Sequence, residues 1–154
     1  MSQPEDRERL VRIADYQFGH RVGEALFAGD LRIERSKSGR PRQVHAPEGR
    51  LVSLGADGRF TLGTEGGRRL LGIGSAPANR VVVGDESEPF VREGKNVFSK
   101  FVTEADPEIR PGDEVCVVHE SGDLLAVGRV ELPAIAMGAF ETGVAVTVRE
   151  GCDD

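Results

Sequence analysis

Apolar residues between positions 10 and 26 recur every three or four residues, which is the spacing of one face of an α-helix. The apolar positions are Leu10, Ile13, Ala14, Phe18, Val22, Ala25 and Leu26. Asp15 is placed to cap a second helical segment, and Gly29 is placed to end it. The pattern therefore predicts helical structure at the start of the chain.

After residue 30 the pattern changes to short extended segments. They are separated by Ser38-Gly39 and Asp57-Gly58, dipeptides that are typical of tight turns. The expected extended segments are residues 31–33, 43–44, 51–54 and 60–62. A short helix is expected around residues 67–71, and residues 72–77 have the composition of a linker. We expect residues 1–78 to form a small α+β domain, with helices against an antiparallel sheet.

The second half is mostly strands. The expected strands are residues 80–83, 97–102, 114–118, 124–132 and 144–148, and residues 134–140 form a compact connection. Asp85 is placed to cap a short helix that runs through Phe90 and Val91. Residues 110–113 and 121–122 read as tight turns, the first with Asp113 bonded to local backbone. Short strands at this spacing predict a small closed β-barrel over residues 79–151, so the fold class is α+β.

Charge divides the two halves. Residues 1–78 contain 13 Lys/Arg and 10 Asp/Glu, a balance of +3, whereas residues 79–154 contain 7 and 16, a balance of −9. Of the 20 basic residues, 17 are arginine. Few lysines and many carboxylates are expected of a protein that works in concentrated salt, so we interpret the source as halophilic.

Several classes of protein are excluded. The apolar runs are too short to span a bilayer, and the polar, acidic N-terminus does not read as a signal peptide, so a cytoplasmic protein is expected. Cys116 and Cys152 form no Cys-x-x-Cys pair, and His20, His45 and His119 are scattered, so no metal site is expected. No cofactor and no catalytic residue are expected either, because no nucleophile constellation and no complete glycine-rich nucleotide loop is present.

The second half resembles a PUA domain, an RNA-binding module of tRNA- and rRNA-modifying enzymes. The resemblance is carried by residues 80–83, 90–92, 97–98, 109–115, 125–128 and 143–146, together with Gly94. It implies a mixed β-barrel with structured RNA as partner. It also implies that the helix-to-strand region around Gly94 faces the RNA.

The first half resembles the domain that precedes the PUA module in archaeal tRNA-guanine transglycosylase, the archaeosine enzyme. The residues that carry this resemblance are 14–19, 25–27, 38–40 and 57–62. A complete transglycosylase has a catalytic barrel with a nucleophilic aspartate and a zinc site. These 154 residues are too few for that barrel and lack the zinc ligands. The resemblance therefore implies tRNA or another structured RNA as partner, without transglycosylation.

The stretch from Arg92 to Phe101 is the first candidate RNA-binding surface. Its candidate residues are Arg92, Gly94, Lys95, Asn96, Ser99 and Lys100. Glycine lets a sugar-phosphate chain approach the backbone, leaving main-chain N–H groups for phosphate oxygens, and the lysines supply mobile charge. The alternative is that Val97, Phe98 and Phe101 belong to the core and the lysines are only solvated. We favour core for Val97 and Phe98, and RNA contact for Gly94, Lys95 and Asn96.

The second candidate surface is an arginine-rich hairpin over residues 32–50. Its candidate RNA-binding residues are Arg32, Arg35, Lys37, Arg40 and Arg42, and Arg50 adds a further charge. With Ser38-Gly39 at the tip, such a hairpin could lie along an RNA groove and contact phosphates and 2′-hydroxyls. A solvated hairpin of a salt-adapted protein explains the same residues equally well.

These observations lead to one hypothesis and a rival. The hypothesis is a non-catalytic RNA-binding protein that engages the acceptor stem and 3′ end of tRNA and presents it to a separate modification enzyme. The rival is a protein-interaction or assembly subunit of an RNA-modification or ribosome-related complex.

Overall fold

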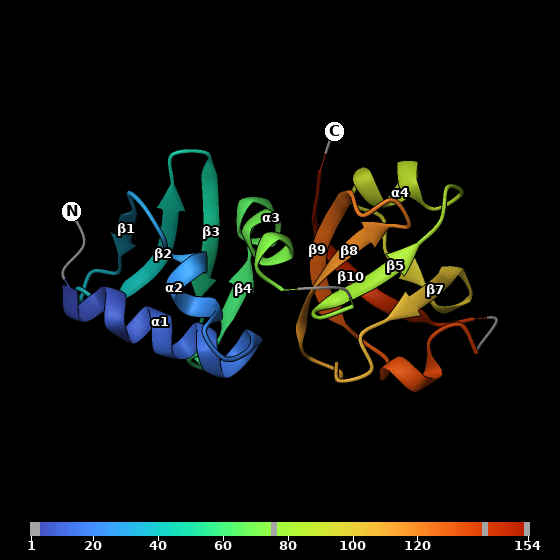
Figure 1. The fold of residues 1–154 in the computed structure, drawn as a ribbon, viewed down its shortest axis with the longest axis horizontal. Coiled ribbons are helices and arrows are strands. Elements are labelled where there is room, and N and C mark those ends of the chain that lie inside the picture. Colours follow the sequence, from blue (N-terminus) through green and yellow to red (C-terminus); the bar gives the residue numbers. More distant parts are fainter. Residues whose placement is uncertain (1–3, 75–76, 140–141, 153–154) are drawn as a thin grey trace. The chain divides into compact units, whose positions relative to one another are not determined.

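The computed structural model describes residues 4–74, 77–139 and 142–152, and it divides the chain into two compact units, Met1–Gly74 and Ser75–Asp154 (Figure 1). The first is a helix-and-sheet unit and the second is built mainly of strands. The α+β prediction is confirmed. Among the described residues no helix is both long and apolar enough to cross a membrane.

The N-terminal unit packs three helices with a four-stranded antiparallel sheet. Its elements are α1 (Pro4–Phe18), α2 (Val22–Leu26), β1 (Arg32–Arg35), β2 (Pro41–Ala46), β3 (Gly49–Leu54), β4 (Phe60–Leu62) and α3 (Thr64–Ile73). The strands pair in chain order, β1-β2-β3-β4. The helices, the strands and both predicted turns lie where the sequence pattern placed them, although α3 extends further in both directions than expected.

Two polar side chains of α1 fix it to the rest of this unit. The Asp15 carboxylate accepts a hydrogen bond from the Gly23 N–H at 2.7 Å, so it caps α2 from within the preceding helix. The Gln17 amide donates to the Phe60 carbonyl and accepts from the Phe60 N–H, both at 2.8 Å, and so anchors α1 to β4. Beneath these contacts the rings of Phe27 and Phe60 pack edge to face, with centroids 5.7 Å apart.

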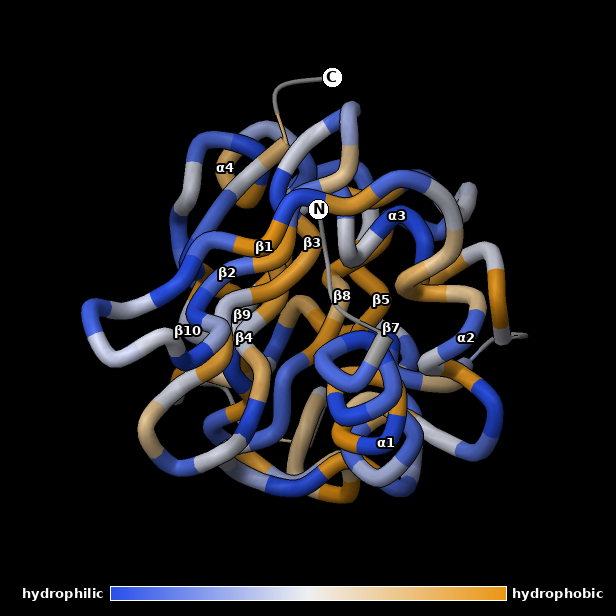
Figure 2. The backbone as a smooth tube through the Cα atoms, turned by 90° about the vertical axis from the view of Figure 1, so that its left-hand side faces the viewer, coloured by the Kyte–Doolittle hydropathy of each residue, from blue (hydrophilic) through white to orange (hydrophobic). Residues whose placement is uncertain are grey.

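The C-terminal unit is a six-stranded sheet curled into a nearly closed barrel. Its elements are β5 (Arg80–Val83), α4 (Glu88–Arg92), β6 (Val97–Phe98), the 3-10 turn η1 (Ser99–Phe101), β7 (Val102–Ala105), β8 (Glu114–His119), β9 (Leu124–Val130), the 3-10 turn η2 (Ala134–Ala136) and β10 (Val144–Gly151). The strand order is β6-β10-β9-β8-β5-β7, and β5 and β8 are the parallel pair. Hydrophobic segments follow the strands, while the loops are mostly hydrophilic (Figure 2).

The core of this unit is rich in β-branched residues, which suit a pleated and buried surface. Val81, Val117, Leu125 and Val146 are among its fully buried members. The turn before β8 is as predicted, since the Arg110 N–H donates to the Asp113 carboxylate at 2.9 Å.

Three expectations for this unit were wrong in detail. Residues 97–102 are not one strand, because the chain turns through η1 where the Ser99 N–H donates to the Gly143 carbonyl. Asp85 does not cap α4, whose N-cap is Ser87; the Asp85 carboxylate bonds His119 instead. The strand expected over residues 124–132 ends at Val130. Of the connection expected over residues 134–140, Phe140 lies outside the described residues.

Gly66 in α3 tests how tightly the N-terminal unit is packed. A Cβ at this position would lie 2.0 Å from the Leu51 carbonyl oxygen of β3, so we expect Gly66→Ala to lower the free energy of unfolding by about 2 kcal/mol or more. Gly72 lies in the same helix, and a Cβ there meets nothing within 4 Å. Gly72→Ala is therefore expected to be neutral or stabilising by up to about 1 kcal/mol. Urea unfolding monitored by circular dichroism measures both, and equal effects would contradict the packing.

Cys116, in β8, makes the free energy of unfolding depend on pH. Burial raises the pKa of its thiol to about 12, whereas the pKa of a cysteine thiol in an unfolded chain is about 8.5. Above that pH the unfolded chain loses the proton and the folded one keeps it, so stability falls as pH rises from about 9 toward 12. We expect Cys116→Val to show a shallower decline in urea unfolding over this range; parallel curves for the two proteins would contradict the assignment.

Candidate RNA-binding pocket

A cavity of about 470 Å³ opens on the C-terminal unit beside α4 and the segment that follows it. Its lining residues are Glu86, Ser87, Phe90, Val91, Lys95, Asn96, Val97, Phe98 and Phe101. Val91 and Val97 are buried and belong to the core, but Phe90 and Phe98 are 58% and 47% exposed. The expectation that Phe98 is core was therefore wrong. Large aromatic side chains left exposed beside a cavity indicate a ligand surface.

Gly94 creates the bend that shapes this pocket. α4 ends at Arg92, and Gly94 has a φ of +100°, a conformation that favours glycine. The Gly94 N–H donates to the Val91 carbonyl at 2.9 Å, and the Lys95 N–H donates to the Phe90 carbonyl at 3.0 Å. These bonds close the C-terminus of the helix. The prediction that main-chain N–H groups at this bend are free for phosphate oxygens was therefore wrong for Gly94 and Lys95.

Asn96 is anchored by its side chain. Its Oδ1 accepts a hydrogen bond from the Val148 N–H of β10 at 3.0 Å. Because a backbone N–H can only donate, this bond fixes the orientation of the amide. Its nitrogen has no partner among the residues that the structure describes, and the residue lines the pocket. Asn96 can therefore donate hydrogen bonds to a ligand there.

The two lysines of this stretch are exposed. Lys95 lines the cavity, and Lys100 Nζ lies 5.1 Å from the centre of the Phe101 ring, within cation–π range. Within the described ranges the Lys95 ammonium has no ion-pair partner. Both charges are thus available beside the exposed aromatic rings.

The other two residues predicted in this stretch are occupied by structural contacts. The Arg92 guanidinium pairs with Glu88 at 3.0 Å and donates to the Cys152 carbonyl at 3.3 Å. Ser99 is fully buried, and its hydroxyl donates to the Ala136 carbonyl and accepts from the Gly138 N–H. The structure therefore gives Ser99 no surface for direct contact with RNA.

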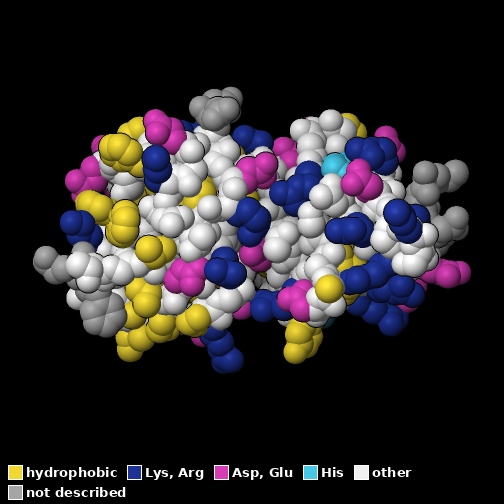
Figure 3. All heavy atoms as spheres, turned by 180° about the vertical axis from the view of Figure 1, so that it is seen from behind, with side chains coloured by type: hydrophobic (Ala, Val, Ile, Leu, Met, Phe, Trp, Pro, Cys, Tyr) yellow, Lys and Arg dark blue, Asp and Glu magenta, His cyan; other side chains and the backbone are white. Residues whose placement is uncertain are grey.

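On the N-terminal unit, Lys and Arg side chains gather over one face (Figure 3), but many cations of the predicted hairpin are engaged. Arg35 pairs with Asp6, the Arg40 guanidinium donates to the Gly55 carbonyl, and Arg32 lies 3.7 Å from Glu34. Arg50 bonds Ser53. Lys37 and Arg42 are exposed, and neither has a polar side-chain partner within the described part of the chain. The hairpin thus offers fewer free charges than its composition suggests.

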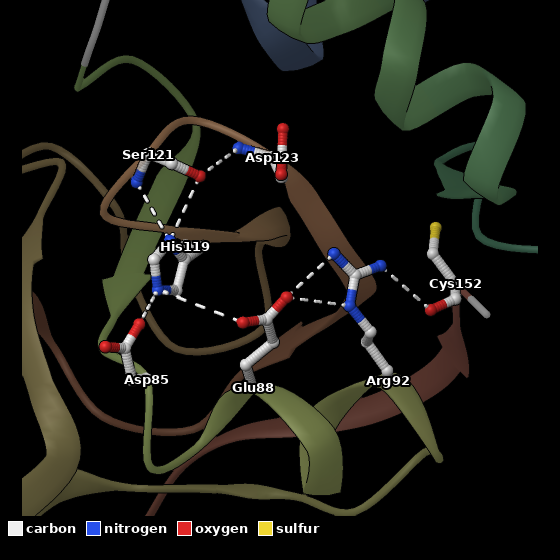
Figure 4. A network of polar contacts seen from close by, with 7 residues as sticks. All are labelled: Asp85, Glu88, Arg92, His119, Ser121, Asp123 and Cys152. Atoms are coloured by element: carbon white, nitrogen blue, oxygen red, sulfur yellow. Dashed lines mark hydrogen bonds and ion pairs between the residues drawn. The ribbon is translucent and has the colours of Figure 1, made fainter. Parts of the chain in front are cut away.

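Asp85, Glu88 and His119 form a cluster with potential metal ligands, whose atoms lie within 4.8 Å of one another (Figure 4). The Ser121 N–H donates to His119 Nδ1 at 3.0 Å, so the neutral ring carries its proton on Nε2 and donates it to Asp85 at 2.6 Å. A histidine that ligates a metal through Nε2 normally keeps its proton on Nδ1. This arrangement therefore favours a hydrogen-bonded link between the loop that precedes α4 and the end of β8.

Sequence reasoning did not single out Glu86, Ser87 or Phe90 as site residues, yet all three line the cavity. Phe90 was placed on a short helix and in the PUA-like pattern, and Glu86 and Ser87 were not considered. An apolar residue on a five-residue helix gives little periodicity from which to judge exposure.

Comparison with known proteins accounts for nearly the whole chain. Residues 8–77 match the family described as the patch-forming domain C2 of tRNA-guanine transglycosylase, and residues 79–152 match the PUA domain. The tRNA-guanine(15) transglycosylase of Methanobrevibacter smithii is 45% identical over 149 residues, which are 96% of this chain and 23% of the relative. That of Pyrococcus furiosus is 47% identical over 146 residues, 94% of this chain and 25% of the relative. The chain spans about a quarter of the length of these curated relatives.

Solved structures agree with this fold. A hypothetical protein from Pyrococcus horikoshii superposes with a TM-score of 0.70 at 20% identity, covering 99% of this chain and 93% of that one. A conserved PUA domain protein from Thermoplasma acidophilum gives a TM-score of 0.64 at 22% identity, covering 100% and 93%. Residues 79–152 thus match the PUA domain, and over nearly its whole length the chain resembles the C2 and PUA region of archaeal tRNA-guanine(15) transglycosylase.

Proposed function

We propose that this chain is a non-catalytic RNA-binding protein that binds tRNA, at its acceptor stem and 3′ end, and serves tRNA modification. The observation that carries the proposal is the pocket of the C-terminal unit, where exposed aromatic rings, the Lys95 ammonium and the Asn96 amide donor meet, with Lys100 beside the Phe101 ring of its lining. The curated relatives support tRNA as the RNA, because they are named as enzymes that act on a guanine of tRNA.

The pocket suits an unpaired nucleotide better than a duplex. Phe90 and Phe98 offer faces on which a base can stack, and a cavity of about 470 Å³ has the size of a small-molecule site. Lys95 and Lys100 can contact the phosphates that follow such a base. The unpaired part of a tRNA acceptor arm is its 3′ end, so the 3′ end enters the pocket in this proposal.

The charge of residues 79–154 limits how this unit can bind. Their balance of −9 opposes a polyanion, so contacts other than general electrostatic attraction must hold the RNA. Stacking and hydrogen bonds depend less on salt than phosphate contacts do. Binding of this kind persists in the concentrated salt to which the composition is suited.

The arginine-rich hairpin supplies a second, electrostatic contact in this proposal. Lys37 lies at its tip and Arg42 on β2, and both are exposed without a polar partner among the described residues. They would contact phosphates of the acceptor stem, which fixes position on an RNA helix without reading its sequence. The bound tRNA would then be held for a separate modification enzyme.

Lys95 in the pocket and Lys100 beside it provide the test. We expect Lys95→Ala/Lys100→Ala to weaken tRNA binding about tenfold or more, because each substitution removes an ammonium group and its charge-assisted contact with the RNA. The slope of log affinity against log salt should also become shallower by about one to two units. Fluorescence titration with labelled tRNA at several salt concentrations measures both quantities.

Arg9→Ala/Arg110→Ala is a matched control, because it removes the same number of exposed positive charges away from the pocket. If both double variants lose affinity equally, the effect is one of net charge and the pocket is not the site. Unchanged affinity in Lys95→Ala/Lys100→Ala rejects the proposed surface. A chain that binds no RNA and purifies with a stoichiometric protein favours the assembly-subunit alternative.

A further inference from the structure

Glu86 is an unexpected residue in a pocket proposed to bind RNA. It is exposed and lines the cavity, and its carboxylate has no hydrogen-bond or ion-pair partner among the described residues. Its neighbours are different, since Asp85 bonds His119 and Glu88 bonds Arg92. Of these three carboxylates, Glu86 is the one that lines the cavity.

A free carboxylate at this place repels phosphate, because two negative charges would meet beside a partly apolar cavity. It lies in a unit that is already strongly acidic. A carboxylate in a nucleic-acid site is useful for the opposite reason: it accepts hydrogen bonds from N–H and O–H groups. The ligand group that reaches Glu86 must therefore be a hydrogen-bond donor and not a phosphate.

The other polar groups of the pocket define the rest of the ligand. Lys95 and the Asn96 amide nitrogen both donate hydrogen bonds, whereas Glu86 accepts them. Phe90 and Phe98 require a flat or apolar face. The matching ligand is a flat body that carries an acceptor and a donor on different edges. A nucleoside meets this description in two ways, through an exocyclic amine of its base or through the ribose hydroxyls that are free at a 3′ terminus.

We propose that Glu86 is a specificity-determining residue, which accepts a hydrogen bond from the exocyclic amine or the terminal ribose hydroxyls of an unpaired nucleoside in the pocket. This inference rests on the proposed RNA-binding function. Glu86 raises selectivity rather than general affinity, because it penalises every ligand that presents a phosphate or only acceptors at that edge.

The experiment uses the full chain and three labelled single-stranded oligoribonucleotides that differ only at the 3′ nucleoside. One ends in adenosine, one in purine riboside, which lacks the exocyclic amine, and one in 2′,3′-dideoxyadenosine, which lacks both terminal hydroxyls. Each is titrated against the unmodified chain and Glu86→Gln. Glu93→Gln is the matched control, since it removes the same charge from an exposed residue that does not line the pocket.

We expect the unmodified chain and Glu93→Gln to prefer adenosine over one of the two analogues by about tenfold or more. In Glu86→Gln this preference should fall to about twofold or less, because the charge-assisted bond is lost. The analogue that is disfavoured identifies the donor: purine riboside indicates the amine and the dideoxy end indicates the hydroxyls.

Equal binding of all three oligonucleotides by the unmodified chain overturns the inference and leaves the RNA-binding proposal standing. The inference is also overturned, with the RNA-binding proposal still standing, if Glu86→Gln retains the full preference for adenosine. If no oligonucleotide and no tRNA binds, both proposals fail.

Discussion

The pocket depends on how α4 ends. Two backbone hydrogen bonds, from Gly94 to Val91 and from Lys95 to Phe90, close the helix through a residue with positive φ. They turn the chain within a few residues, so that Phe90 on the helix and Lys95 beyond it border one cavity. This closure uses the N–H groups of Gly94 and Lys95. Gly94 therefore contributes the direction of the chain, and the side chains that line the cavity contribute the contacts.

Charge and chemistry are divided between the two units. The N-terminal residues carry a small positive balance, but ion pairs and backbone contacts occupy several of their arginines. The C-terminal residues are strongly acidic, yet the aromatic pocket with Lys95, and Lys100 beside its Phe101, are here. In the function proposed above, one unit supplies attraction to the phosphate backbone and the other supplies stacking and hydrogen bonds. Such a division suits a protein in salt, because the second kind of contact is screened least.

Most elements of the fold could be predicted from the sequence because their signals are local. Glycines such as Gly39 and Gly58 mark turns with positive φ, and apolar alternation marks the strands between them. The failures involve partners distant in the chain. Asp85 was read as a helix cap because its partner His119 lies 34 residues away. Residues 97–102 were read as one strand because the bonds that bury Ser99 come from Gly143 and Ala136, which are distant in the sequence.

The sequence also predicted some features of the candidate site and not others. Lys95 and Asn96 were predicted to share a surface, and they line one cavity, because adjacent residues at a glycine bend lie close together; their contact with RNA stays a prediction. Phe98 was assigned to the wrong side of its strand, since a two-residue strand has no alternation to measure. The engagement of Arg35 by Asp6 could not be foreseen either, because it depends on how α1 packs against the sheet.

The position of β10 determines when the cavity can form during synthesis. β6 pairs with β10, and the Asn96 side chain accepts the N–H of Val148, so one wall of the cavity is held by a strand that is made after α4 and β6. A nascent chain whose residues 144–151 are still inside the exit tunnel has α4 and both lysines but lacks the strand that holds this wall. The wall is therefore complete only after β10 has left the ribosome and paired with β6.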